Sequence, residues 1–141
     1  MRDEDESKHL EFIQNVIARM ANNSFLLKGW TVTLVAALFA LAAQNANLNF
    51  VILGFFPVIT FWILDAYYLR QERLFRQLFD AIRAKDADKV QSNESYSMDT
   101  RPYEGRVQSW FRIMFSKTIS IFYGLIIITQ IIIVIILNVS F

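Results

Sequence analysis

The sequence predicts an all-helical membrane protein with three transmembrane helices, a cytoplasmic helical stalk and further amphipathic helices. Of the 141 residues, 55% are hydrophobic, and they are gathered in blocks instead of recurring at an amphipathic period. That pattern fits a bilayer better than a water-soluble core. Three blocks reach the roughly 20 mostly apolar residues that a spanning helix needs. They are 25–43, 48–69 and 118–139.

Lysine and arginine are distributed unevenly around these spans. Ten of the 14 lie between residues 70 and 117, and none lies between the first two spans or after the third. The positive-inside rule therefore predicts that the N-terminus and residues 70–117 are cytoplasmic. The loop between the first two spans and the C-terminus are then periplasmic or extracellular. The acidic start does not resemble a cleaved signal peptide, so we expect the first span to remain as an anchor.

These observations predict one membrane domain with four parts. The parts are an amphipathic arm, a transmembrane hairpin, a cytoplasmic helical insert and a third transmembrane helix, over 1–24, 25–69, 70–117 and 118–141.

The arm is expected to begin with disorder over the charged residues 1–7 and to continue as a separate amphipathic helix. Its apolar face either packs on another cytoplasmic helix or lies on the membrane, and its low lysine and arginine content favours packing. The polar triplet 22–24 is suited to ending this helix and capping the first span. Within that span Gly29, Thr33 and Ala37 recur every four residues, a spacing typical of helices that approach one another closely in lipid.

Two charged residues of the hairpin, Lys28 and Asp65, lie the same number of residues from the centre of its loop. At a rise of about 1.5 Å per residue they share one depth, near the cytoplasmic edge. An ionised group in hydrocarbon is costly unless it is paired or reaches water. Either the two residues form an ion pair, within or between copies, or Lys28 extends to the headgroups while Asp65 binds water or Arg19.

Three further residues mark the interior of the spans. Pro57 removes a helical hydrogen bond and predicts a kink near Gly54, which is either a gating hinge or a static bend. Gln130 is a polar side chain at mid-depth, so it either bonds across an interface between copies or lines a water-filled path. With Lys28 and Asp65 these residues form the candidate intramembrane site.

The second span is expected to continue past its apolar block as a cytoplasmic stalk. An apolar stripe that includes Leu74 and Leu78 needs a protein partner there. Glu72 and Arg76 have the spacing of a favourable helical ion pair. Residues 84–102 read as an exposed loop, and the chain from Tyr103 as an interfacial amphipathic helix leading directly into the third span.

The excess of basic residues in the insert could attract anionic lipid, a nucleotide or an acidic partner. Arg70, Arg73 and Arg76 are the candidates for binding an anionic ligand or partner.

No pattern in the sequence points to an enzyme. The chain has no cysteine and one histidine, His9, which we interpret as a solvated surface residue. No phosphate-binding loop or catalytic motif is found. We therefore expect no catalytic residue, no metal, no cofactor and no specific nucleic-acid binding.

The runs NSFLLKGWTVTLVAALFALAA, FFPVITFWILDAYYLRQERLFRQLFD and FSKTISIFYGLIII resemble small uncharacterised bacterial membrane proteins. Their layout is similar to the two-helix membrane effector domains of nucleotide-signalling and antiphage defence systems, from which the third span departs. The resemblance implies a homo-oligomeric effector that forms or gates a pore, or disrupts the membrane, when a cytoplasmic protein or nucleotide signal arrives. The alternative is a non-conducting membrane anchor or scaffold for a soluble cytoplasmic partner.

Overall fold

The computed structural model describes residues 2–45, 47–88 and 97–139, and no strand occurs among them. The elements are α1 (Arg2–Asn45), α2 (Leu48–Leu53), α3 (Phe55–Asp88), the 3-10 helix η1 (Arg101–Arg106), α4 (Trp110–Met114) and α5 (Lys117–Val139).

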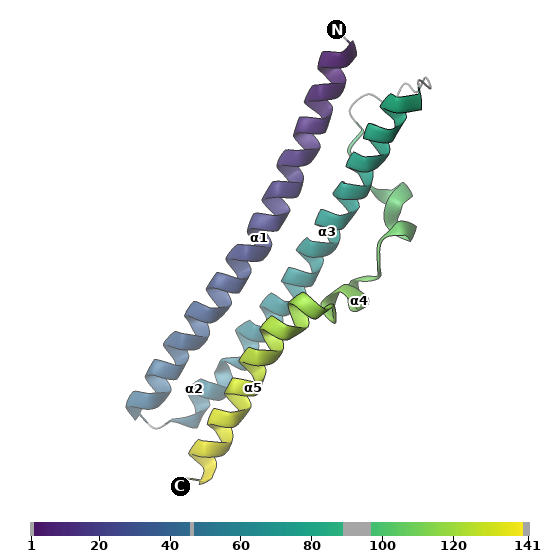
Figure 1. The fold of residues 1–141 in the computed structure, drawn as a ribbon. Helices are drawn as coiled ribbons and strands as arrows, with labels where there is room; N and C mark the ends of the chain where they lie inside the picture. Colours follow the sequence, from purple (N-terminus) through teal and green to yellow (C-terminus); the bar gives the residue numbers. More distant parts are fainter. Residues whose placement is uncertain (1, 46, 89–96, 140–141) are drawn as a thin grey trace.

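The helices form an elongated antiparallel bundle (Figure 1). α1 runs from one end of the molecule to the other, and α2 and α3 return beside it. η1 and α4 lie against the middle of α3, and α5 then runs back toward the end where α1 meets α2. The bundle therefore has three helices at that end and two long helices at the other.

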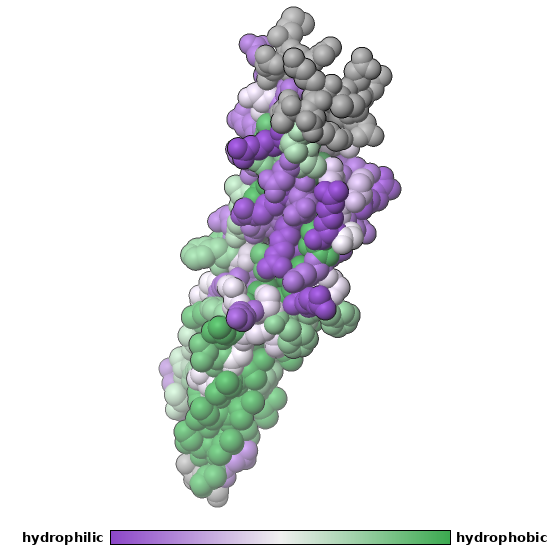
Figure 2. All heavy atoms as spheres, turned by 45° about the vertical axis from the view of Figure 1, so that its right-hand side comes forward, coloured by the Kyte–Doolittle hydropathy of each residue, from purple (hydrophilic) through white to green (hydrophobic). Residues whose placement is uncertain are grey.

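This change in helix number coincides with a change in surface chemistry. In the view of Figure 2, hydrophobic side chains cover the end that contains α5, and hydrophilic side chains gather on the described surface farther from that end. We call the first the apolar half: α5, α2, α1 beyond Ser24, and α3 up to Asp65. The remainder of the described chain is the polar half.

Three helices are long and apolar enough to cross a membrane, as the sequence predicts. They are Glu4–Gln44, Leu48–Ala84 and Lys117–Val139. The first two extend well beyond the predicted spans because each continues into the polar half as one helix.

The N-terminal part differs from the prediction. α1 is continuous from Arg2 to Asn45, so neither the disorder expected before Lys8 nor the cap expected at 22–24 is present. Ser24 does not cap a helix because its hydroxyl is used in contacts with Lys28 and with α3. The arm and the first span are therefore one rod.

A hydrophobic core joins the three helices of the apolar half to α4. It is built from buried residues of α1, α3, α4 and α5, namely Val35, Val58, Ala66, Ile113, Ile119 and Tyr123. Close van der Waals packing of these side chains holds the helices together. The outer faces of the same helices carry many exposed large hydrophobic side chains, which is compatible with a protein that crosses a membrane.

In the polar half α3 continues as the predicted helical stalk, and other elements of the chain pack on it. α3 continues to Asp88, and Leu74 and Leu78 on it are buried. α1 and η1 lie beside α3 in this half (Figure 1). Intrachain packing thus covers part of the stripe that we expected to need a partner.

The connection to the third span is more broken than predicted. Part of the expected 84–102 loop is helical up to Asp88, and residues 89–96 lie outside the described residues. Val107 is extended (φ −107°, ψ 141°) between η1 and α4, and a turn at Phe115 separates α4 from α5. The prediction of a single interfacial helix that leads directly into the third span is therefore wrong. The extended backbone at Val107 separates η1 from α4, so one continuous helix cannot form there.

Candidate functional site

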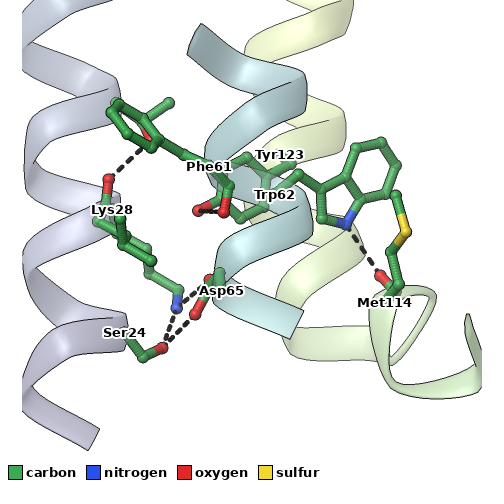
Figure 3. Close-up of polar contacts among 9 residues, drawn as sticks. Ser24, Lys28, Phe61, Trp62, Asp65, Met114 and Tyr123 are labelled. Atoms are coloured by element: carbon green, nitrogen blue, oxygen red, sulfur yellow. Dashed lines mark hydrogen bonds and ion pairs between the residues drawn. The ribbon is translucent and has the colours of Figure 1, made fainter. Parts of the chain in front are cut away.

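Lys28 and Asp65 face each other across α1 and α3. The Lys28 Nζ lies 2.5 Å from Asp65 Oδ2. The same ammonium donates to Ser24 Oγ at 2.9 Å, and the Ser24 hydroxyl donates to Asp65 Oδ1. Figure 3 shows these three side chains as a closed triangle, with Ser24 and Lys28 on one helix and Asp65 on the next.

The burial of the triangle is unequal. The Asp65 side chain is completely buried, whereas 23% of the Lys28 side chain is exposed. A buried carboxylate loses its hydration and is tolerated only when paired and hydrogen-bonded. Asp65 Oδ1 accepts a hydrogen bond from Ser24, and Oδ2 is ion-paired with Lys28 but has no hydrogen-bond partner in the described chain.

The structure confirms the predicted pair and places it within one copy of the chain. Arg19, the alternative partner for Asp65, instead lines a separate groove in the polar half. Ser24 was not predicted as part of the site. Its position one helical turn before Lys28, on the same face, is the signal that could have found it.

The end of α4 and the start of α5 contact α3 at the level of the ion pair through two aromatic residues. Trp62 donates from Nε1 to the Met114 carbonyl at 2.9 Å, and Tyr123 donates to the Phe61 carbonyl at 3.3 Å. The Trp62 and Tyr123 rings are stacked, with centroids 5.9 Å apart. These contacts, drawn in Figure 3, hold the start of α5 beside the ion pair. Neither was predicted, because contacts between residues about 50 to 60 positions apart leave no local pattern.

A second cluster lies deeper in the apolar half, at the junction of α2 and α3. The helix breaks at Gly54, whose N–H donates to the Phe50 and Val51 carbonyls at 3.2 and 3.1 Å. Pro57 has no N–H, so the Leu53 carbonyl lacks the donor that a regular helix would supply four residues later. The helix is therefore interrupted for one residue near the predicted position, where Gly54 itself keeps a right-handed helical conformation.

Gln130 of α5 packs directly on this break. A Cβ added to Gly54 would lie 2.6 Å from Gln130 Nε2, a distance at which something must shift. The Gln130 side chain is fully buried, and neither of its polar atoms has a hydrogen-bond partner in the described chain. Within the single chain the amide thus faces α2 and not an outer face of α5.

The five predicted intramembrane residues therefore form two clusters and not one. Gly54 and Asp65 are 11 residues apart, which corresponds to about 16 Å along a helix. The outer cluster contains an ion pair, and the inner one an unpaired amide beside a helix break.

The three candidate arginines are separated by the structure. Arg73 and Arg76 line a groove of about 310 Å³ with Arg106 and Gln108, which come from the η1–α4 segment. Arg70 does not line it, and its buried Nε has no hydrogen-bond partner in the described chain. Arg76 forms the predicted pair with Glu72, at 2.7 Å.

His9 corrects another expectation. It is buried, and its Nε2 lies 3.1 Å from the Ser97 carbonyl. The residues after the stalk fold back onto α1 at this point, which local sequence does not reveal. Across the described residues no three histidine or acidic side chains are arranged to hold a metal ion.

No protein-family model, curated protein or solved structure was found to match the chain. The functional argument therefore rests on the two clusters, the groove and the helices that connect them.

Proposed function

We propose that this protein is a homo-oligomeric effector of the bacterial inner membrane that forms or gates a pore, or disrupts the bilayer, in response to a cytoplasmic protein or nucleotide signal. One observation carries the proposal. The Lys28–Asp65 pair joins two helices, α1 and α3, that each run unbroken from that pair into the polar half.

The continuity of these helices provides a mechanical link. α1 extends 26 residues before Lys28 and α3 extends 23 residues beyond Asp65, about 35 to 39 Å of helix in each case. A partner that shifts one rod against the other moves the two charges apart. A separated charge in hydrocarbon is costly, so the rearrangement that follows must bring water or a new partner to it.

Self-association is supported by the free face of α1. Gly29, Thr33 and Ala37 are exposed, and nothing lies within 4 Å of a Cβ built at Gly29. Small residues on an open face permit close approach of a second helix in lipid. Because core side chains fill the space between the helices of one copy, we place the conducting path between copies.

The test is membrane potential and dye entry in bacteria after induced expression. Wild-type chain should depolarise the cells, and Asp65→Asn should change the effect at equal membrane abundance because it removes the charge that holds Lys28. Glu11→Gln is the matched control, since Glu11 is an exposed carboxylate of α1 that lines neither of the two grooves. Depolarisation that is identical in the wild type and in Asp65→Asn would remove the ion pair from the mechanism.

A role in antiphage defence enters this proposal only through the resemblance in layout. The proposed orientation, with the polar half in the cytoplasm, follows from the positive-inside rule. Cysteine labelling from either side of the membrane, at Gln44→Cys and at Arg83→Cys, tests it directly.

The second candidate function is a non-conducting scaffold for a soluble partner. It is favoured by a groove of about 500 Å³ in the polar half, lined by His9, Phe12, Asn15, Val16, Arg19 and Met98. Phe12 is 56% exposed there, far from the apolar half. This function predicts stable co-purification of a soluble protein, loss of that protein in Phe12→Ser, and no ion flux in liposomes.

A further inference from the structure

The groove between α3 and the η1–α4 segment combines residues that are distant in sequence. Arg73, Arg76 and Asp80 come from α3, and Arg106 and Gln108 from the other side. Its volume of about 310 Å³ is at the lower end of the ~300–1,000 Å³ range of small-ligand sites.

The charges in the groove are not balanced within the described chain. Arg76 is paired with Glu72, but no carboxylate forms an ion pair with Arg73 or Arg106. Arg73 Nη1 instead donates to Gln108 Oε1 at 3.4 Å. The Arg106 guanidinium lies over the Tyr103 ring, 5.6 Å from its centroid. Two guanidinium groups on opposite walls are thus positioned by neutral partners.

The groove also lies close to the level at which the apolar half ends. Arg73 is eight residues beyond Asp65, or about 12 Å along the helix. Beside the groove, α4 presents Phe111, which is 68% exposed, and the turn that follows presents Phe115. Exposed aromatic side chains next to basic ones are typical of segments that lie at the headgroup level.

We propose that this groove is a binding site for a phosphate ester, held between Arg73 and Arg106 with Gln108 as a further hydrogen-bonding group. Guanidinium groups bind phosphate through paired N–H donors, and two of them from separate elements fix its position. The phosphate belongs either to a phospholipid headgroup or to a soluble nucleotide. The site goes beyond the proposed pore, because occupancy would join η1 to the stalk whether or not the protein conducts.

The experiment uses the full chain in neutral detergent and native mass spectrometry. One arm titrates phosphatidylglycerol and the other ATP, with phosphatidylcholine as the neutral lipid reference. The test variant is Arg73→Gln with Arg106→Gln. The matched control is Arg83→Gln with Arg101→Gln, which removes two charges from exposed positions outside the groove.

Saturable binding of one probe should weaken by about tenfold or more in the test variant, and by about twofold or less in the control. Binding of the lipid alone identifies a headgroup site, and binding of ATP alone identifies a nucleotide site. Equal weakening in both double variants, or no saturable binding of either probe by the wild type, overturns the proposal.

Charge and geometry are separated by a third variant, Arg73→Lys with Arg106→Lys. It keeps both positive charges but loses the forked donors, so its binding should fall between the wild type and the test variant. Wild-type affinity in this variant contradicts a guanidinium site. Because the assay needs no ion flux, a failed depolarisation experiment and a failed binding experiment are distinguishable.

Discussion

The two halves of the molecule place their charged and polar side chains in opposite ways. Three polar contacts at the inner surfaces of the apolar half join different helices: Lys28 with Asp65, Trp62 with Met114 of α4, and Tyr123 with Phe61. In the polar half the ion pairs are local and exposed to different degrees: Glu72 with Arg76, and Asp99 with Arg101. These contacts of the apolar half therefore join different helices, whereas the ion pairs of the polar half join residues at most four positions apart.

The proposed placement of the apolar half in the bilayer and of the polar half in water accounts for this difference. In hydrocarbon an unpaired polar atom finds no water, so a contact between helices is strongly preferred over none. In water the same contact replaces hydration, and its net contribution is small. The comparison can be sharpened by removing equivalent groups from the two halves.

The largest difference in the free energy of unfolding is expected between the ion pairs Lys28–Asp65 and Glu72–Arg76. Lys28→Met leaves Asp65 buried without its cation and should lower the free energy of unfolding by about 3–5 kcal/mol. Arg76→Met removes the i,i+4 pair with Glu72 and should cost about 0.3–0.5 kcal/mol. Both changes are measured by denaturant unfolding in mixed micelles, and Lys28→Met with Asp65→Leu should recover most of the larger loss. Equal effects of the two single variants would mean that Asp65 reaches water.

The next difference is expected between two glycines of the apolar half. Gly54→Ala places a Cβ 2.6 Å from Gln130 Nε2, and overpacking of this kind costs about 1–3 kcal/mol. Gly124→Ala meets nothing within 4 Å and should be neutral or stabilising by up to about 1 kcal/mol. The same unfolding assay measures both.

A double variant ties the first effect to Gln130. Gly54→Ala should be much less harmful when combined with Gln130→Ala, because the shortened side chain leaves room for the added methyl. If the two substitutions are additive, the break at Gly54 is not in contact with the amide.

Gln130 tests the rule that the apolar half pairs its polar groups, since it is the exception. Gln130→Leu keeps a similar size and removes an amide without hydrogen bonds in the described chain. The variant should be more stable by about 1–3 kcal/mol, the cost of an unsatisfied buried polar group. A loss of stability in the bilayer would show that the amide is bonded there, to water or to another group, and that this half has no exception.

Much of the architecture could be predicted because its causes are local. Hydropathy blocks identify the spans, Pro57 identifies the break, and counting the helical rise from the loop places Lys28 and Asp65 at one level. Each inference needs only neighbouring residues and a constant geometry.

The remainder depends on contacts between distant residues. The triplet 22–24 resembles a helix cap, but Ser24 bonds Asp65 of α3 and the helix continues. Arg106 joins the groove only because η1 folds onto the stalk. Tyr123 and Gln130 face inward because α5 has a particular rotation about its axis, which an almost uniformly apolar helix does not encode in its own pattern.

The smallest effect is expected at the exposed pair Asp99–Arg101. Hydrogen bonds from the Arg101 side chain and backbone hold the pKa of the Asp99 carboxyl below its ordinary value. The contribution of the ionised Asp99 carboxyl to stability is therefore present above the pKa that this carboxyl has in the unfolded chain. It is lost as pH falls through the lower pKa of the folded chain. A carboxyl carbon titration by NMR should show this lowered midpoint, and Arg101→Gln should raise it toward the ordinary value. Added salt should reduce the shift at Asp99, since screening acts mainly on exposed charges. If the Asp99 midpoint does not depend on salt, the contrast between exposed ion pairs in the polar half and buried contacts in the apolar half is contradicted.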